Sequence, residues 1–143
     1  MSSSQVVIFF DTNKLYGAFR YRLLNGLLHD SILKDLHDEY VVVVSEYVLY
    51  ELSTNIVKKE NILDANKRIL AFITYLWRKI SISSDLQETY LSYVSDPNDA
   101  QILQDAVDIQ ASFLLTNNTK DFYIKNIYDS FGILVINDLI QVR

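Results

Sequence analysis

The sequence predicts a single α/β domain, a three-layer α/β/α sandwich whose mostly parallel sheet is covered by helices on both faces. The length of 143 residues suffices for one hydrophobic core and is too small for two. The β-prone segments are continuous apolar runs, which is typical of strands buried on both faces. These runs alternate with helical patterns, as in a parallel sheet. We therefore interpret residues 1–143 as one domain.

The first half of the chain contains two predicted strands, at residues 6–10 and 40–44, and a helical pattern at about residues 14–28 between them. Ser45 occupies an N-cap position. The helix that follows has an apolar stripe with a spacing of four residues, formed by Val48, Leu52 and Ile56. A further helix is predicted at about residues 62–79, and residues 80–84 are ambiguous.

The second half begins with a helical pattern at residues 85–94. Asp96 and Pro97 open the next helix as an N-cap followed by proline at the first helical position. Its predicted buried stripe is Ile102, Ala106 and Ile109. The remaining predicted elements are a strand at 112–115, a short helix at 120–127 and a closing strand at 132–136.

Composition restricts the chemistry that this domain can carry. Cysteine is absent, which excludes disulfide bonds and thiolate zinc sites, and the two histidines are too few for a histidine-rich metal site. A bound metal would therefore have carboxylate and amide ligands, which suit Mg²⁺ or Mn²⁺ better than Zn²⁺. The net charge of −5 does not favour nucleic-acid binding through a basic patch, although acids gathered around cations are compatible with a nuclease.

No targeting or membrane segment is apparent in the sequence. The first four residues lack basic side chains, and the apolar run at residues 6–10 is too short for a signal peptide. No apolar run approaches the roughly 20 residues that span a membrane. We therefore expect a cytoplasmic protein with no membrane partner.

Polar side chains follow the predicted strands at the points where these strands end. Ligands of parallel sheets bind at the carboxyl ends of strands, beside a reversal in strand order. We therefore expect these side chains to gather at one sheet edge and to hold a divalent metal. They are Asp11 and Asn13 after the first strand, Glu51 in the helix after the second, Asp96 and Asp99 before the strand at 112–115, and Thr116, Asn118 and Asp121 after it.

Each acid also has a purely structural interpretation. Asp11 could begin a helix, Glu51 flanks an apolar stripe where glutamate is usually solvated, and Asp121 could be a first-turn acid. Asp96 and Asp99 have the spacing of a capping-box variant. Asp99 nevertheless shares the face of the predicted buried stripe, where an unpaired carboxylate is costly unless a cation binds. One metal site explains these positions better than four coincidences.

Four short motifs resemble those of PIN domains. They are residues 10–13 (FDTN), 45–52 (SEYVLYEL), 96–102 (DPNDAQI) and 115–122 (LTNNTKDF). Each motif is weakly specific, but four in order are strong, and the resemblance extends over about residues 5–140. It is closest to bacterial PIN proteins related to VapC toxins.

The resemblance implies a five-stranded parallel sheet, homodimers, and Mg²⁺- or Mn²⁺-dependent cleavage of RNA by the toxin of a toxin–antitoxin pair. Two positions depart from the family pattern, because Leu103 and Asp105 stand where the helix usually has small residues. By motif position, the resemblance implies that the catalytic metal ligands are Asp11, Glu51, Asp99 and Asp121. The predicted supporting groups are Asn13, Thr116, Asn118 and Asp96.

The sequence disfavours two other classes of enzyme and leaves one alternative function open. A haloacid-dehalogenase-type phosphatase needs a second acid two residues after the first, where this chain has Asn13. A P-loop enzyme is excluded because its glycine-rich motif is absent. The serious alternative is a PIN fold that binds RNA or an antitoxin partner with little turnover, and the four intact acids favour the enzyme.

Overall fold

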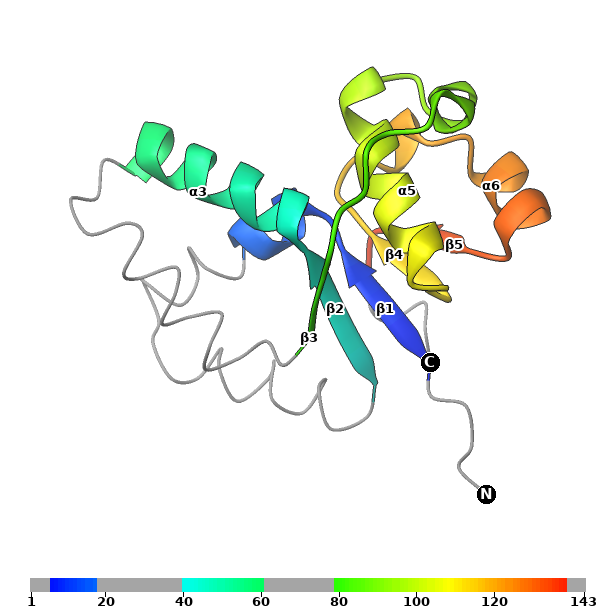
Figure 1. Ribbon diagram of the computed structural model, residues 1–143, viewed down its shortest axis with the longest axis horizontal. Helices are drawn as coiled ribbons and strands as arrows, with labels where there is room; N and C mark the ends of the chain where they lie inside the picture. Colours follow the sequence, from blue (N-terminus) through cyan, green and yellow to red (C-terminus); the bar gives the residue numbers. More distant parts are fainter. Residues whose placement is uncertain (1–5, 18–39, 61–78, 139–143) are drawn as a thin grey trace.

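The computed structural model describes residues 6–17, 40–60 and 79–138 of the chain. Five strands form one sheet in the order β3-β2-β1-β4-β5, and every neighbouring pair is parallel (Figure 1). The strands are β1 (Val7–Phe10), β2 (Val41–Ser45), β3 (Lys79–Ser81), β4 (Phe113–Leu115) and β5 (Leu134–Ile136). The predicted α/β fold with a five-stranded parallel sheet and flanking helices is therefore confirmed.

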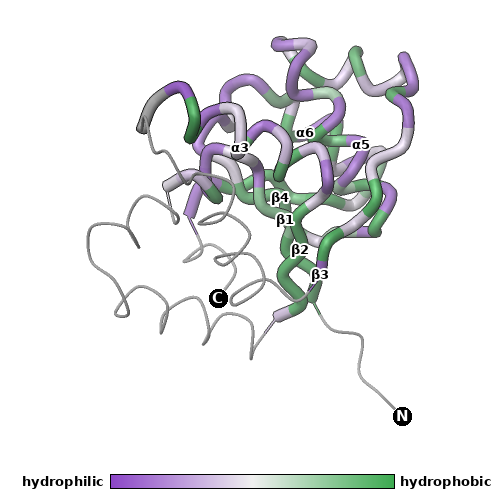
Figure 2. The backbone as a smooth tube through the Cα atoms, turned by 60° about the vertical axis from the view of Figure 1, so that its left-hand side comes forward, coloured by the Kyte–Doolittle hydropathy of each residue, from purple (hydrophilic) through white to green (hydrophobic). Residues whose placement is uncertain are grey.

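The central strands form the core of the described structure. Ile8, Phe9, Val43 and Leu114 have no exposed surface, and Figure 2 shows the strands as a band of hydrophobic residues. Burial of each large apolar side chain contributes about 1.5–3 kcal/mol relative to exposure. The continuous apolar runs of the sequence thus mark strands covered on both faces.

Among the described residues, helices lie beside the sheet at α3 (Glu46–Glu60), α5 (Ala100–Asp108) and α6 (Ile124–Phe131). Helix α3 packs against β2 and α5, and α6 packs against β5. The predicted stripe of α3 is fully buried, and the amide of Val48 donates to Ser45 Oγ at 3.3 Å, which confirms the N-cap. In α5, Ile102 and Ala106 are buried, whereas Ile109 lies just beyond the helix end and is half-buried.

The order of the strands locates the place where a ligand would bind. The chain proceeds outward from β1 to β2 and β3, then returns to the other side of β1 to form β4 and β5. The reversal lies between β1 and β4, where the amide of Asp11 donates to the carbonyl of Leu115 at 3.0 Å. In open parallel sheets the crevice at such a reversal is the usual binding site.

Two predicted elements have different boundaries in the structure. The ambiguous segment at 80–84 contributes to β3, which begins at Lys79, a residue that we expected to end a helix. The helical pattern at 85–94 forms a 3₁₀ helix over Glu88–Tyr93 rather than an α-helix. This segment is short and its side chains are mostly exposed, so it lacks the continuous apolar face that stabilises a longer α-helix.

The predicted helix at 120–127 is wrong, because Phe122 interrupts it. Phe122 has extended backbone angles and forms an isolated antiparallel bridge with Val94, which buries its side chain. The segment is therefore divided into a 3₁₀ helix at Thr119–Asp121 and helix α6. A contact between residues distant in the sequence overrides the local helical pattern here.

Parts of two further predictions lie outside the described residues. Residues 12–17 are helical, so the first predicted helix begins at residue 12 rather than at 14, and residues 18–28 are not described. Residues 62–78 of the helix predicted at 62–79 are also outside the described ranges. Within those ranges, no helix is long and apolar enough to cross a membrane.

Gly132 ends helix α6 in a left-handed conformation with φ of 70°, and its amide donates to the carbonyl of Tyr128 at 2.9 Å. We had placed this glycine in the closing strand. Gly132→Ala should lower the free energy of unfolding by about 1 kcal/mol, because alanine is strained at positive φ. A Cβ there would meet no atom within 4 Å, so the loss comes from the backbone alone. Urea denaturation measures it, with the smaller expected loss of Gly132→Asn as control. An alanine variant as stable as wild type would contradict this role.

Candidate metal centre

Asp11 lies directly after β1 and is almost completely buried, with 3% of its surface exposed. Its Oδ2 accepts hydrogen bonds from Thr116 Oγ1 at 2.8 Å and from Asn13 Nδ2 at 3.4 Å, and its Oδ1 accepts from the amide of Thr12 at 2.6 Å. Burial raises the pKa of Asp11, and the three hydrogen bonds oppose that rise. Because this carboxylate is held on both oxygens, it does more than begin a helix.

Glu51 lies in the second turn of α3 and is half-buried. Its Oε1 accepts a hydrogen bond from Thr12 Oγ1 at 2.7 Å. Burial raises the pKa of Glu51; the bond from Thr12 lowers it, and the charge of Asp11 raises it further. The interpretation of Glu51 as a solvated residue on a helix flank is therefore wrong.

Asp99 is the last residue of the 3₁₀ helix Pro97–Asp99, which leads into α5. This helix begins where Asp96 Oδ1 accepts from the amide of Asn98 at 3.0 Å, so the predicted N-cap is present. Asp99 Oδ2, in contrast, is buried without any hydrogen-bond partner in the part of the chain that the structure describes. Burial raises the pKa of Asp99 to about 7, assisted by the negative charges of Asp11, Asp96, Asp121 and Glu51.

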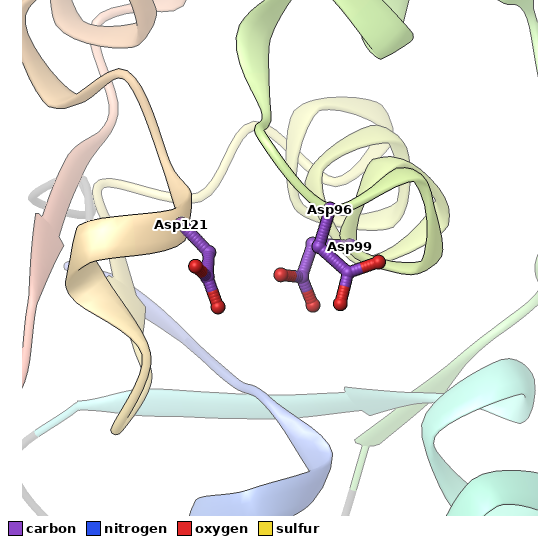
Figure 3. Close-up of side chains that lie close together, drawn as sticks. All are labelled: Asp96, Asp99 and Asp121. Carbon is purple, nitrogen blue, oxygen red and sulfur yellow. The ribbon is translucent and has the colours of Figure 1, made fainter.

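Asp99 also belongs to a cluster of three aspartates, together with Asp96 and Asp121. One carboxylate oxygen from each of Asp96, Asp99 and Asp121 lies within 4.8 Å of the other two. Figure 3 shows the carboxylate of Asp121, on the 3₁₀ helix Thr119–Asp121, facing those of Asp96 and Asp99 across a gap. The carbonyl of Asp121 accepts from the amide of Ser95 at 2.8 Å, which joins the segments that carry the three acids.

A pocket of about 300 Å³ opens beside these acids. None of its described lining residues is a lysine or arginine. Asp99 borders the pocket and also belongs to the aspartate cluster, so it connects the two groups of acids. The described lining consists of Asp11, Thr12, Asn13, Tyr16, Glu51, Asn55, Asp99, Asn117 and Asn118.

Three of the four predicted supporting residues, Asn13, Thr116 and Asn118, form a hydrogen-bonded set around Asp11. Asn13 Nδ2 donates to Thr116 Oγ1 at 3.3 Å, and the amide of Asn118 donates to the same hydroxyl at 3.1 Å. Asn13 Oδ1 accepts from the amide of Asn117 at 2.9 Å. Thr116 is fully buried and contacts Asp11, so it orients that carboxylate from behind.

Thr12 and Asn55 also line the pocket, and neither was among the predicted site residues. Thr12 lies between Asp11 and Asn13 and is the donor that fixes Glu51. Its place in the motif was visible, but its partner is 39 residues away and could not be read from spacing. Asn55 lies one helical turn after Glu51, and that i, i+4 spacing was a usable signal for a residue that also lines the pocket.

The donors of this site fit a hard divalent cation. They are carboxylate oxygens whose charges raise the pKa of Asp99 and of Glu51, and one of them, Asp99 Oδ2, is buried with no hydrogen-bond partner among the described residues. Leaving such an oxygen desolvated and unpaired is costly. A cation such as Mg²⁺ or Mn²⁺, which prefers oxygen ligands, would offset the repulsion between the carboxylates and would give Asp99 Oδ2 a partner.

Comparisons with known proteins agree with the fold. The sequence model of the family described as PIN domain matches residues 7–120, most of the chain. A chain in the crystal structure of VapBC2 from Rickettsia felis bound to a DNA fragment from their promoter has the same fold, with a TM-score of 0.59. It is 19% identical in sequence, and the match covers 92% of this chain and 98% of that chain. No curated protein matches the sequence.

Proposed function

Because the chain belongs to the PIN domain family, we propose that it is a metal-dependent endoribonuclease that hydrolyses phosphodiester bonds of single-stranded or structured RNA. The observation that carries this proposal is Asp99 Oδ2, which is buried without a partner while four other carboxylates raise the pKa of its group. Carboxylates arranged in this way repel one another in the absence of a cation. Their arrangement therefore favours a metal-binding role over a purely structural one.

The proposed metal ligands are Asp11, Glu51, Asp99 and Asp121, and Mg²⁺ or Mn²⁺ is the proposed cofactor. When bound, such an ion supplies positive charge that orients a phosphodiester and makes water more acidic for in-line attack on phosphorus. Asp96 supports the site by capping the helix that carries Asp99.

The remaining contacts orient the proposed ligands and the substrate. Thr116 and Asn13 hold Asp11, while Thr12 holds Glu51, so neither carboxylate has to be ordered when RNA binds. Asn117 and Asn118 line the pocket with exposed side chains. Their amide groups can donate hydrogen bonds to phosphate oxygens or to a ribose 2′-hydroxyl.

A cleavage assay on labelled single-stranded RNA tests the activity. We expect products with Mn²⁺ or Mg²⁺ and none with excess EDTA. Asp11→Asn should abolish cleavage because the amide carries no charge. The amide has the same shape and should leave the protein folded, and circular dichroism checks this because its NH₂ group must face one of the donors that hold Asp11. Asp129→Asn, an exposed substitution on α6, is the control and should cleave normally. Equal cleavage by wild type and Asp11→Asn would identify a contaminant, and RNA binding without cleavage would favour a binding module.

We also propose that this nuclease acts as the toxin of a toxin–antitoxin pair and forms a homodimer. The likeness in fold to a chain of the VapBC2 structure supports this role. A small DNA-binding protein encoded by the neighbouring reading frame would be the expected antitoxin. Its co-expression should suppress RNA cleavage, and failure to bind this chain would contradict the pairing.

A further inference from the structure

Asp105 is a buried carboxylate outside the pocket, on the face of α5 that is turned toward the start of α3. Only 1% of its surface is exposed. Its Oδ2 accepts from Ser83 Oγ at 2.8 Å and its Oδ1 accepts from Gln101 Nε2 at 2.9 Å, and the hydroxyl of Ser45 also hydrogen-bonds to it. Burying a carboxylate at such a position costs free energy, and these three donors offset that cost. The presence of an acid here therefore requires an explanation.

Two of the three donors are serines that cap helix α3. Ser45 Oγ accepts from the amide of Val48, and Ser83 Oγ accepts from the amide of Tyr47 at 3.0 Å. Both amides belong to the first turn of the helix, whose N–H groups have no partner within the helix itself. A carboxylate can only accept, so Asp105 turns both hydroxyl protons toward itself and leaves the serine lone pairs facing the amides. Its negative charge also lies near the positive end of the dipole of α3.

The first turn of α3 is connected directly to Glu51. Tyr47 precedes Glu51 by one helical turn, and its side chain hydrogen-bonds to the Glu51 carboxylate. Thr12, at the start of the helical segment that follows β1, donates a hydrogen bond to the same carboxylate. Two contacts therefore set the direction in which the Glu51 side chain points into the pocket. One is the hydrogen bond from Thr12, and the other is the contact with Tyr47 in the first turn of α3, which Asp105 fixes through Ser45 and Ser83.

We propose that Asp105 is a positioning residue that fixes the first turn of α3 through Ser45 and Ser83 and so holds Glu51 in place for the metal. The inference rests on the proposed function, because Glu51 is one of the proposed ligands. Asp105 is also one of the two departures from the family pattern, and this network gives the acid a role that a small residue could not fill.

Amide hydrogen exchange of the metal-free full chain tests the first step. Asp105→Asn keeps the shape of the side chain, but its NH₂ group has to face Gln101, Ser45 or Ser83, so one of these three donors must turn and the network loses a contact. We expect exchange of the Tyr47 and Val48 amides to accelerate about fivefold to tenfold, the size of a lost helix cap. The matched control is Gln104→Met, because Gln104 is equally buried but holds Ser84, Asp85 and Gln87 instead of α3. It should leave Tyr47 and Val48 unchanged.

The dissociation constant of Mn²⁺ alone, measured by calorimetry, tests the second step. Asp105→Asn should weaken Mn²⁺ binding about tenfold, as is typical when a group that orients a ligand is removed. Gln104→Met should change it less than twofold. Ser83→Ala should reproduce part of the loss, and it replaces Asp105→Asn if that variant does not fold.

Unchanged exchange at Tyr47 and Val48 would overturn the inference, and so would equal weakening of Mn²⁺ binding by both variants, which would indicate general destabilisation. If the wild-type chain binds no Mn²⁺, the proposed function fails, and the exchange result alone decides whether Asp105 orders α3.

Discussion

Asp99→Asn is expected to reduce RNA cleavage by at least about a hundredfold while making the metal-free protein more stable. Asp99 borders the pocket and also belongs to the aspartate cluster, so the substitution removes charge from both groups of acids. Loss of a group that merely orients a ligand costs 10–100-fold, and loss of a ligand should cost more. Stability should rise at pH 8 because the amide does not repel Asp96 and Asp121, and its NH₂ can donate to them.

Cleavage rates, the Mn²⁺ dissociation constant and the melting temperature in EDTA are the three measurements. The matched control is Asp108→Asn, which removes the same charge from an exposed position at the end of α5, the helix that follows Asp99. It should cleave RNA at the wild-type rate. Full activity in Asp99→Asn would remove Asp99 from the proposed ligands. Lower stability without metal would mean that the buried carboxylate is structurally required, contrary to the absence of a partner for its Oδ2.

The fold was largely predictable because each central strand of the sheet has a recognisable apolar pattern in its own sequence. Residues 41–44 are four valines, and no other arrangement buries both faces of such a run so simply. Elements that depend on contacts with residues distant in the sequence have no such pattern. Phe122 ends a helical pattern because it pairs with Val94, and β3 is a short strand whose place depends on β2. Local propensity alone could not reveal either pairing.

The candidate site was predictable to a different degree for each residue. Asp11 followed from its position after the first strand, and Asp99 from the buried face that it shares with Ile102. Glu51 required the motif, because the hydrogen bond that holds its carboxylate comes from Thr12, which belongs to another element. Asp96 combines both interpretations of the sequence, since it caps a helix and also faces the cluster.

The stability of the metal-free protein is expected to fall as the pH rises from about 4 to about 7. The pKa of Asp99 is about 7 in the folded protein against 3.8 for a free aspartate. Over that interval the unfolded chain has already ionised this group while the folded state still holds the proton, so ionisation favours unfolding. The contribution of Asp99 is fully present below about pH 4 and is lost above about pH 7. Asp11 and Glu51 have pKa shifts in the same direction and add to the slope.

Melting temperatures in EDTA at pH 5.5 and pH 8 measure this effect. Stability changes by about 1.4 kcal/mol per pH unit while the folded state alone holds the proton, so the interval from pH 5.5 to the pKa of about 7 corresponds to roughly 2 kcal/mol. Asp99 is half-exposed, and solvent screening reduces this to about 0.5–1 kcal/mol. The melting temperature should then be lower at pH 8 by roughly 2–5 °C. Saturating Mn²⁺ at pH 8 should more than reverse the loss, because binding at a hundred times the dissociation constant stabilises by about 2.7 kcal/mol.

Asp99→Asn separates the contribution of this residue from the contributions of the other acids. The variant should lose most of the difference between the two pH values, whereas Asp108→Asn should retain it. Equal melting of wild type at both pH values would mean that the carboxylates do not crowd one another, and the argument for a cation would lose its electrostatic basis. Stabilisation by Mn²⁺ that persisted undiminished in Asp99→Asn would instead place the ion away from the gap between Asp96, Asp99 and Asp121.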